Sequence, residues 1–166
     1  IYGESSSALH LVNTTIKQGD AAQGGGLYAT GTSTVTLSNS AVVTDNHSTV
    51  SGGGLSIHNN SSLAVNGATV SNNTSGSGSA IYLNSNAAST FDGATISGNT
   101  SASGSGAIAL SDTSSVTMDS SLVTGNTGRT GGALSLLNGS TGTVTQTQFT
   151  VNSAVSKAGA FMVSGT

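Results

Sequence analysis

The segment GGALSLLNGSTGTVTQTQFTVN, residues 131–152, contains no proline and no charged residue. Apolar and polar residues alternate within three short stretches of it, at 134–136, 143–145 and 149–151. Such alternation is typical of β-strands that bury one face and expose the other. Glycine, serine and asparagine separate the stretches, as they do in turns. Each stretch is too short to bury a core alone, so the segment has to pack against further copies of itself.

The chain contains about six copies of this segment in one frame. A large apolar anchor residue preceded by small residues recurs every 26–28 residues, at Ile1, Leu27, Leu55, Ile81, Ile108, Leu134 and Phe161. An asparagine column lies 18 or 19 residues after the anchor, at Asn46, Asn73, Asn99, Asn126 and Asn152. An apolar column lies about ten residues after the anchor, at Leu11, Leu37, Val65, Phe91, Met118 and Val144. Three columns in one frame identify a repeat protein.

The repeat predicts an all-β fold, namely a parallel β-helix (solenoid) of about six coils of 26–28 residues with three short strands per coil. Each strand then pairs in parallel with its copies in the neighbouring coils, about 4.8 Å away. A two-sheet sandwich is the alternative, but it would show turn signals every 8–12 residues without this longer register. We therefore expect residues 1–166 to form one β-helical segment. Because neither end carries a polar cap, we expect it to belong to a longer array.

GGAL at 131–134 followed by FTVN at 149–152 resembles the GGA[ILV]/FxxN repeat of the polymorphic outer membrane proteins of chlamydiae. Four other copies carry valine or isoleucine in place of the phenylalanine, as in VTDN at 43–46 and ISGN at 96–99. The resemblance implies a right-handed parallel β-helix carried as the passenger of an autotransporter-type surface protein. It also implies an extracellular or cell-surface location, and similar repeats occur in other large extracellular proteins.

The composition excludes several kinds of partner and site. Only 3 lysine and arginine residues stand against 6 acidic ones, for a net charge of −3, so no basic surface is available for nucleic acid. Cysteine is absent, which excludes disulfides and thiolate metal sites. No apolar run approaches the roughly 18 residues of a membrane span. We expect no cofactor, no nucleic-acid partner and no direct membrane insertion.

The asparagine column is the most regular polar feature. An inward asparagine at one corner of every coil can hydrogen-bond its neighbours and the nearby backbone, which would otherwise be buried unpaired. We therefore interpret Asn46, Asn73, Asn99, Asn126 and Asn152 as a structural ladder rather than a binding site.

Acidic and imidazole groups give little sign of catalysis. Asp92 and Asp119 share one position on adjacent coils and form a weak candidate pair for a metal ion, but no third carboxylate joins their column. The histidines His10, His47 and His58 occupy different positions of the repeat, so we expect surface residues and no metal cluster. The sequence thus predicts a protein without catalytic activity.

Outward side chains suggest three kinds of surface. Tyr2, Tyr28 and Tyr82 share one outward position, interrupted by Ser56, and could stack on sugars. Hydroxyl columns that could order ice-like water stand at Thr36, Thr90, Thr117 and Thr143, and at Thr44, Ser71, Ser97, Thr124 and Thr150. Candidate glycosylation sites in turns are Asn13, Asn59, Asn60 and Asn138.

Three functional hypotheses follow. The first is a non-enzymatic extracellular stalk or adhesive passenger segment. Its partners would be neighbouring repeats or copies of itself, joined end to end into a fibre, together with host or matrix glycans. The second is a carbohydrate-binding or polysaccharide-cleaving β-helix. The third is an ice-binding protein that uses the outward threonine and serine columns.

Overall fold

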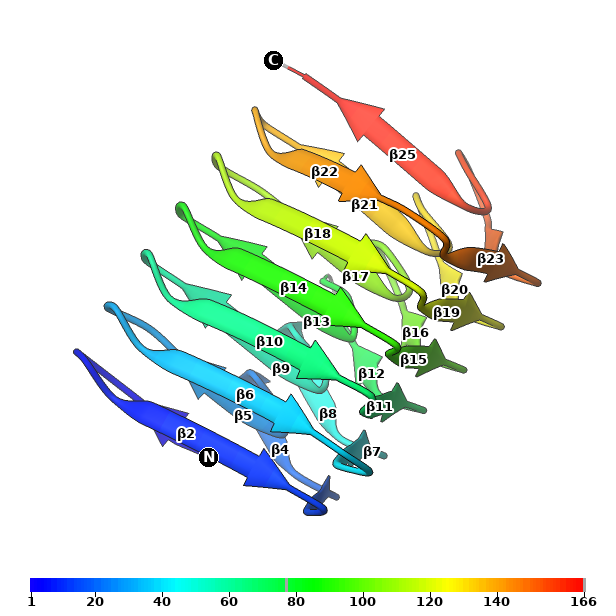
Figure 1. The fold of residues 1–166 in the computed structure, drawn as a ribbon. Helices are drawn as coiled ribbons and strands as arrows, with labels where there is room; N and C mark the ends of the chain where they lie inside the picture. Colours follow the sequence, from blue (N-terminus) through cyan, green and yellow to red (C-terminus); the bar gives the residue numbers. More distant parts are fainter. Residues whose placement is uncertain (77, 166) are drawn as a thin grey trace.

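The computed structural model describes residues 1–76 and 78–165, and this part of the chain contains strands and turns but no helix. The chain winds coil upon coil into a short rod, with all strands in a given sheet running in the same direction (Figure 1). Each coil contributes one strand to each of four parallel sheets, which we call A, B, C and D in the order in which the chain meets them.

The strands of sheet A begin at or just after the anchor residues, and sheet B contains the next strand of each coil. Sheet A consists of β1 (Tyr2–Gly3), β5 (Leu27–Ala29), β9 (Leu55–His58), β13 (Ile81–Asn84), β17 (Ile108–Leu110), β21 (Leu134–Leu137) and β25 (Phe161–Ser164). Sheet B consists of β2 (Ala8–Val12), β6 (Thr34–Ser38), β10 (Ser62–Asn66), β14 (Ala88–Asp92), β18 (Ser115–Asp119) and β22 (Thr141–Val144).

Sheets C and D contain the remaining two strands of each coil. Sheet C consists of β3 (Thr15–Lys17), β7 (Val42–Thr44), β11 (Thr69–Ser71), β15 (Thr95–Ser97), β19 (Leu122–Thr124) and β23 (Gln148–Thr150). Sheet D consists of β4 (Asp20–Gln23), β8 (His47–Ser51), β12 (Thr74–Ser75), β16 (Thr100–Ser101), β20 (Thr127–Gly128) and β24 (Ser153–Ala154).

Neighbouring strands in a sheet pair at equivalent positions of the sequence repeat. Leu27 pairs with Leu55, Leu55 with Ile81, and the anchor residues continue in this way to Phe161. The predicted all-β parallel solenoid of about six coils is confirmed. The prediction of three strands per coil omitted the strand of sheet D. That strand is two to five residues long and mostly hydroxyl-bearing or small, so it leaves no apolar alternation in the sequence.

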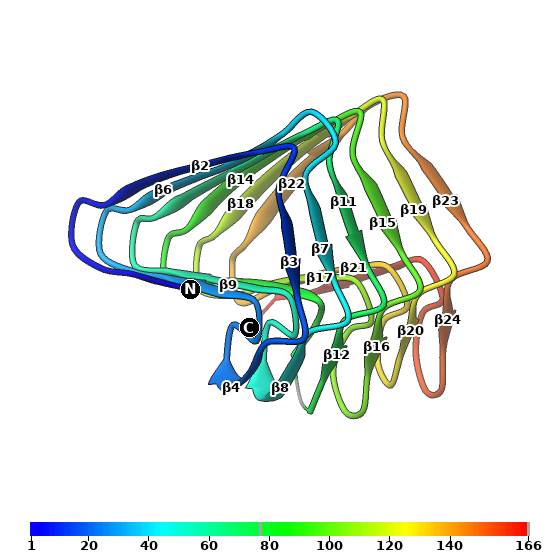
Figure 2. The same ribbon diagram turned by 90° about the horizontal axis from the view of Figure 1, so that it is seen from below.

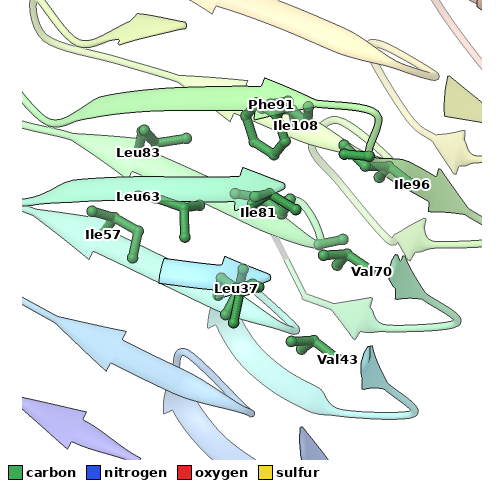
Figure 3. Packing of buried hydrophobic residues seen from close by; sticks show 14 of the residues in the cluster. Leu37, Val43, Ile57, Leu63, Val70, Ile81, Leu83, Phe91, Ile96 and Ile108 are labelled. Carbon is green, nitrogen blue, oxygen red and sulfur yellow. The ribbon is translucent and has the colours of Figure 1, made fainter. Parts of the chain in front are cut away.

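Sheets A, B and C enclose a triangular core, and the loops that carry sheet D project outside it (Figure 2). Aliphatic side chains from the three sheets meet in the middle, among them Ile57 of sheet A, Leu63 of sheet B and Val70 of sheet C (Figure 3). Each of these is at most 2% exposed. Burying one such side chain contributes about 1.5–3 kcal/mol, so the stack of apolar columns is the main source of stability.

Single residues in the left-handed conformation turn the chain at the corners. This conformation strains most side chains, but glycine adopts it freely and asparagine tolerates it. The corner between sheets B and C has one such residue per coil, at Asn13, Asn39, Gly67, Gly93, Ser120 and Gln146. The corner between sheets C and D has another, at Gln18, Asp45, Asn72, Gly98, Gly125 and Val151.

The inward asparagines form a continuous hydrogen-bonded ladder just after the corner between sheets C and D. Each amide donates from Nδ2 to Oδ1 of the asparagine one coil further on, at 2.9–3.1 Å, from Asn46 through to Asn152. The accepting oxygen also takes the backbone N–H of the preceding asparagine, at 2.9–3.1 Å. In the first coil Gly19 holds the equivalent position, and its N–H donates to Oδ1 of Asn46 at 2.9 Å.

The amide nitrogens also donate to backbone carbonyls of the preceding coil. Nδ2 of Asn73 donates to the carbonyl of Val43 at 3.0 Å, and Nδ2 of Asn99 donates to the carbonyl of Val70 at 3.1 Å. A single side chain therefore joins its own coil to the coils on both sides. The small residues before the anchors leave room for it, because a Cβ on Gly54 would lie 3.1 Å from Cγ of Asn73.

Replacing one asparagine of the ladder should destabilise the whole rod. Asn99→Ala leaves the buried N–H of Asn73 without its 2.9 Å acceptor, and the free energy of unfolding should fall by about 2–4 kcal/mol. Urea unfolding followed by circular dichroism measures this. The matched control is Asn66→Ala on the exposed end of β10, which should change stability by no more than about 0.5 kcal/mol. Equal losses in the two variants would contradict a structural role for the ladder.

Candidate binding groove on sheet A

Aromatic rings lie along the outer face of sheet A. Tyr2 and Tyr28 occupy the same register position on adjacent strands, and their rings are parallel within 4°, with centroids 5.6 Å apart. The faces of the two rings are therefore directed at each other. The next residue in the column is Ser56, and after it comes Tyr82.

His58 fills the gap that Ser56 leaves in the tyrosine column. Its ring centroid lies 5.0 Å from that of Tyr28 and 5.7 Å from that of Tyr82. Nε2 of His58 and Oγ of Ser56 lie 2.8 Å apart in a hydrogen bond that fixes the ring. Tyr2, Tyr28, His58 and Tyr82 together make a continuous row, which we call the aromatic strip.

The expectation that His58 is a surface residue was wrong, since the residue ends β9 and is only 8% exposed. The small side chain of Ser56 makes room for the imidazole two positions further along the same strand. Burial lowers the pKa of His58 below its ordinary value of 6.5, so the ring is neutral at neutral pH.

The loops that carry sheet D project on the outer side of sheet A (Figure 2). A hollow of about 430 Å³ lies between Tyr2 and Tyr28 on one side and Ala22, Gln23 and Val50 on the other. A second hollow, of about 200 Å³, is also lined by Gln23 and Val50, and lies against His58, Tyr82, Asn84 and Ser51. The two hollows share the lining residues Gln23 and Val50, and together we call them the sheet A groove.

The lining of the groove is uncharged, and the charges near its ends are negative. No Asp, Glu, Lys or Arg is among the described residues that line either hollow. Hydrogen bonding to the Glu4 carboxylate raises the pKa of Tyr2. Burial raises the pKa of Tyr82, and the nearby charge of Asp112 acts in the same direction. An anionic ligand would therefore meet repulsion at both ends of the aromatic strip.

Comparison with known families assigns the fold. The family described as "Right handed beta helix region" matches residues 1–166, the entire chain. The protein is a right-handed β-helix. No curated protein and no solved structure matches the chain. Within the described residues of this β-helix, no helix has the length and apolar character needed to cross a membrane.

The candidate metal pair of the β-helix lies on sheet B, away from the groove. Asp92 and Asp119 are in register on β14 and β18, as their shared position in the repeat requires. Both oxygens of Asp119 already accept hydrogen bonds, from Thr145 and Ser120, and these bonds lower the pKa of Asp119. Across residues 1–76 and 78–165, no three His, Cys, Asp or Glu residues lie close enough to hold a metal ion.

The remaining candidate residues are spread over the other faces of the β-helix. His10 and His47 are exposed, and Nδ1 of His47 lies 3.0 Å from Oγ1 of Thr74 on the neighbouring strand of sheet D. The candidate glycosylation sites all lie in exposed turns with positive φ, at Asn13, Asn59, Asn60 and Asn138. The ladder asparagines Asn46, Asn73, Asn99 and Asn126 are at most 1% exposed and offer no room for a glycan.

The hydroxyl columns run along sheets B and C of the β-helix. In sheet B, Thr36 is in register with Ala64 and then with Thr90, so one methyl group interrupts the column. In sheet C, Oγ1 of Thr150 donates to Oγ1 of Thr124 at 2.9 Å, so hydroxyls of this column pair with each other. Both columns face away from the core, as the sequence predicted.

The buried imidazole should make the stability of the β-helix depend on pH. Because the folded pKa of His58 lies below 6.5, the unfolded chain binds more protons between these two values. The contribution of the neutral His58 to the free energy of unfolding is complete above pH 6.5. It is lost as the pH falls toward the pKa of His58 in the folded chain. Melting temperatures at about pH 8 and about pH 5 should differ more for the natural chain than for His58→Gln, which cannot titrate there. An identical difference in both proteins would contradict a neutral, buried His58.

Proposed function

We propose that this β-helix is a non-enzymatic, extracellular adhesive segment that binds neutral glycan chains in the sheet A groove. The observation that carries the proposal is the groove itself, with aromatic rings along its floor and uncharged residues on its wall. The resemblance of GGAL and FTVN to surface-protein repeats supports the extracellular part of the proposal.

The groove offers the chemistry that sugars use. A sugar ring presents apolar C–H groups and hydroxyls together, and tyrosine presents an apolar ring with a hydroxyl at its tip. Gln23 and Asn84 add amides, which both donate and accept hydrogen bonds. The strip residues are held in place by their neighbours, so a ligand loses little free energy in ordering them.

The arrangement of charge and strands disfavours other partners. Acidic polysaccharides and nucleic acids need cations, and no described residue of the groove lining carries a positive charge. Peptides that bind as an extra strand need a free sheet edge. The groove floor is instead the face of sheet A, where β5, β9 and β13 are each paired on both sides.

The groove also lacks the groups that cleave glycans. Hydrolysis usually needs two carboxyl groups that flank the scissile bond. The paired carboxylates Asp92 and Asp119 stand on sheet B, and no carboxylate of the described chain lines the groove. Ser56 lies beside His58, but Ser56 is fully buried, so its hydroxyl cannot reach a substrate as a nucleophile. Binding without cleavage is the function that this lining supports best.

Removing a ring from the strip should weaken glycan binding. Isothermal titration calorimetry with cellohexaose, xylohexaose, mannohexaose and chitohexaose tests the natural chain, with polygalacturonate as the acidic comparison. We expect at least one neutral hexaose to bind and the acidic polymer not to bind. Tyr28→Ala should raise the Kd by roughly 5- to 10-fold, because the substitution removes an aromatic contact.

The matched control is Leu122→Ala, which truncates a half-buried side chain on the outer face of sheet C. This variant should bind like the natural chain. If none of the four neutral hexaoses binds, or if both variants lose affinity equally, the groove is not a glycan site.

Incubation with polysaccharides should leave them intact. Reducing-end assays on cellulose, xylan, mannan, chitin and polygalacturonate, with and without calcium, should show no increase above a blank without protein. New reducing ends or unsaturated sugars would favour the alternative hypothesis of a polysaccharide-cleaving β-helix. Loss of that activity in Asp92→Ala and Asp119→Ala would then place the chemistry on sheet B.

The stalk part of the proposal rests on the unbroken pairing of strands along the rod. Every coil is hydrogen-bonded to the next through four sheets and through the asparagine ladder, which makes the segment stiff. Stacking of copies end to end into a fibre would continue the same pairing. Ice binding has less support, because Ala64 interrupts one hydroxyl column and Asp92 and Asp119 stand beside that column in sheet B.

A further inference from the structure

Two of the three tyrosines in the chain are direct neighbours on adjacent strands. Tyr2 on β1 pairs in register with Tyr28 on β5, and the two ring centroids lie 5.6 Å apart, with the ring planes within 4° of parallel. Tyr82 has no tyrosine beside it, because Ser56 and Ala109 hold the same position on the two adjoining strands. The fold therefore brings one pair of phenols together and keeps the third apart.

The two neighbouring rings differ in how firmly they are held. Tyr28 is half-buried, and its ring stacks on Tyr2 on one side and on His58 on the other, with a centroid distance of 5.0 Å to the imidazole. Tyr2 is 64% exposed, and among the described rings it stacks only on Tyr28. A rotation of the exposed Tyr2 ring brings the carbon beside its hydroxyl, Cε, against Cε of Tyr28.

The composition makes these phenols the main targets of one-electron oxidants. Cysteine and tryptophan, the other side chains that such oxidants attack readily, are absent from the chain. A neutral phenol loses a proton together with the electron, so a base beside the ring assists its oxidation. The carboxylate of Glu4, whose hydrogen bond raises the pKa of Tyr2, stands beside that phenol as a proton acceptor.

We propose that Tyr2 and Tyr28 form an oxidative cross-linking site, at which hydrogen peroxide and a haem peroxidase join the two rings as dityrosine. Each phenol loses one electron and one proton and becomes a phenoxyl radical. A carbon–carbon bond then forms between the two Cε atoms, and the hydrogen on each joined carbon moves to the phenol oxygen of the same ring. The two electrons and two protons that the phenols release convert one hydrogen peroxide into two waters.

The cross-link would join the first coil covalently to the second. Tyr2 and Tyr28 enclose strands β2, β3 and β4, so the new bond closes a loop that contains the whole first coil. Closing such a loop restricts the unfolded chain and opposes separation of the coil from the rod. Coupling within one molecule is favoured over coupling between molecules, because the fold holds the two rings beside each other before the reaction.

Treatment of the purified chain with a haem peroxidase and hydrogen peroxide tests the site. The blue fluorescence of dityrosine should appear in monomeric protein, with a yield per molecule that does not change on dilution. Proteolysis and tandem mass spectrometry should identify linked peptides that contain Tyr2 and Tyr28 and have lost two hydrogen atoms. Tyr2→Phe and Tyr28→Phe should each abolish this product, whereas the matched control Tyr82→Phe should leave its yield unchanged.

Hydrogen exchange measures the effect of the cross-link on the first coil. Backbone amides of β2 and β3 should exchange several-fold more slowly in the coupled protein than in the untreated one. Tyr2→Phe treated in the same way should show no change.

The possible results decide the proposal independently of glycan binding. Dityrosine found only in covalent dimers, or formed equally in Tyr2→Phe and Tyr82→Phe, would overturn the cross-linking site. Unchanged exchange in β2 and β3 of the coupled protein would overturn its effect on the first coil. None of these measurements uses a glycan, so failure of the glycan groove and failure of the cross-linking site are separate results.

Discussion

The register of this β-helix depends on the asparagine side chain that every coil from Asn46 onward places at the same inward corner. The side chain of Asn73, for example, accepts a hydrogen bond from Asn46, donates one to Asn99 and donates another to the carbonyl of Val43. The backbone N–H and C=O groups at this corner are buried and cannot hydrogen-bond to water, so the asparagine side chains serve as their partners. A coil with one residue more or fewer between anchor and asparagine would have to absorb the difference in a surface loop. The ladder therefore sets the register that the aliphatic columns then follow.

The sequence was sufficient to predict the scaffold because inward positions have to recur. Leu55, Val65 and Val70 sit at fixed distances from one another within their coil, and their counterparts repeat those distances in the next coil. The strand of sheet D was missed for the opposite reason. Segments such as Thr100–Ser101 contain no apolar residue, so neither periodicity nor hydropathy marks them.

The candidate site could not be predicted to the same extent. The tyrosines were visible as a column, but His58 belongs to no column, and its place in the strip depends on the small Ser56 two residues before it. The wall of the groove depends on the longer sheet D strands of the first two coils, where β4 spans Asp20–Gln23 and β8 spans His47–Ser51, while β12 spans only Thr74–Ser75. Beyond Tyr82 the column becomes Ala109 and Ser135, so the strip covers only part of the rod. The scaffold repeats, whereas the site is local.

The position of sheet D outside the aliphatic triangle has a consequence for how such rods diversify. Its side chains, such as Ser48 and Ser75, pack within the projecting loops and contribute nothing to the apolar columns of sheets A, B and C. A loop can therefore lengthen, shorten or change its chemistry in one coil while the core and the asparagine ladder stay as they are. In this architecture the core residues of the coil stay the same while the loop residues vary, so a single rod can display a series of unrelated surfaces along its length.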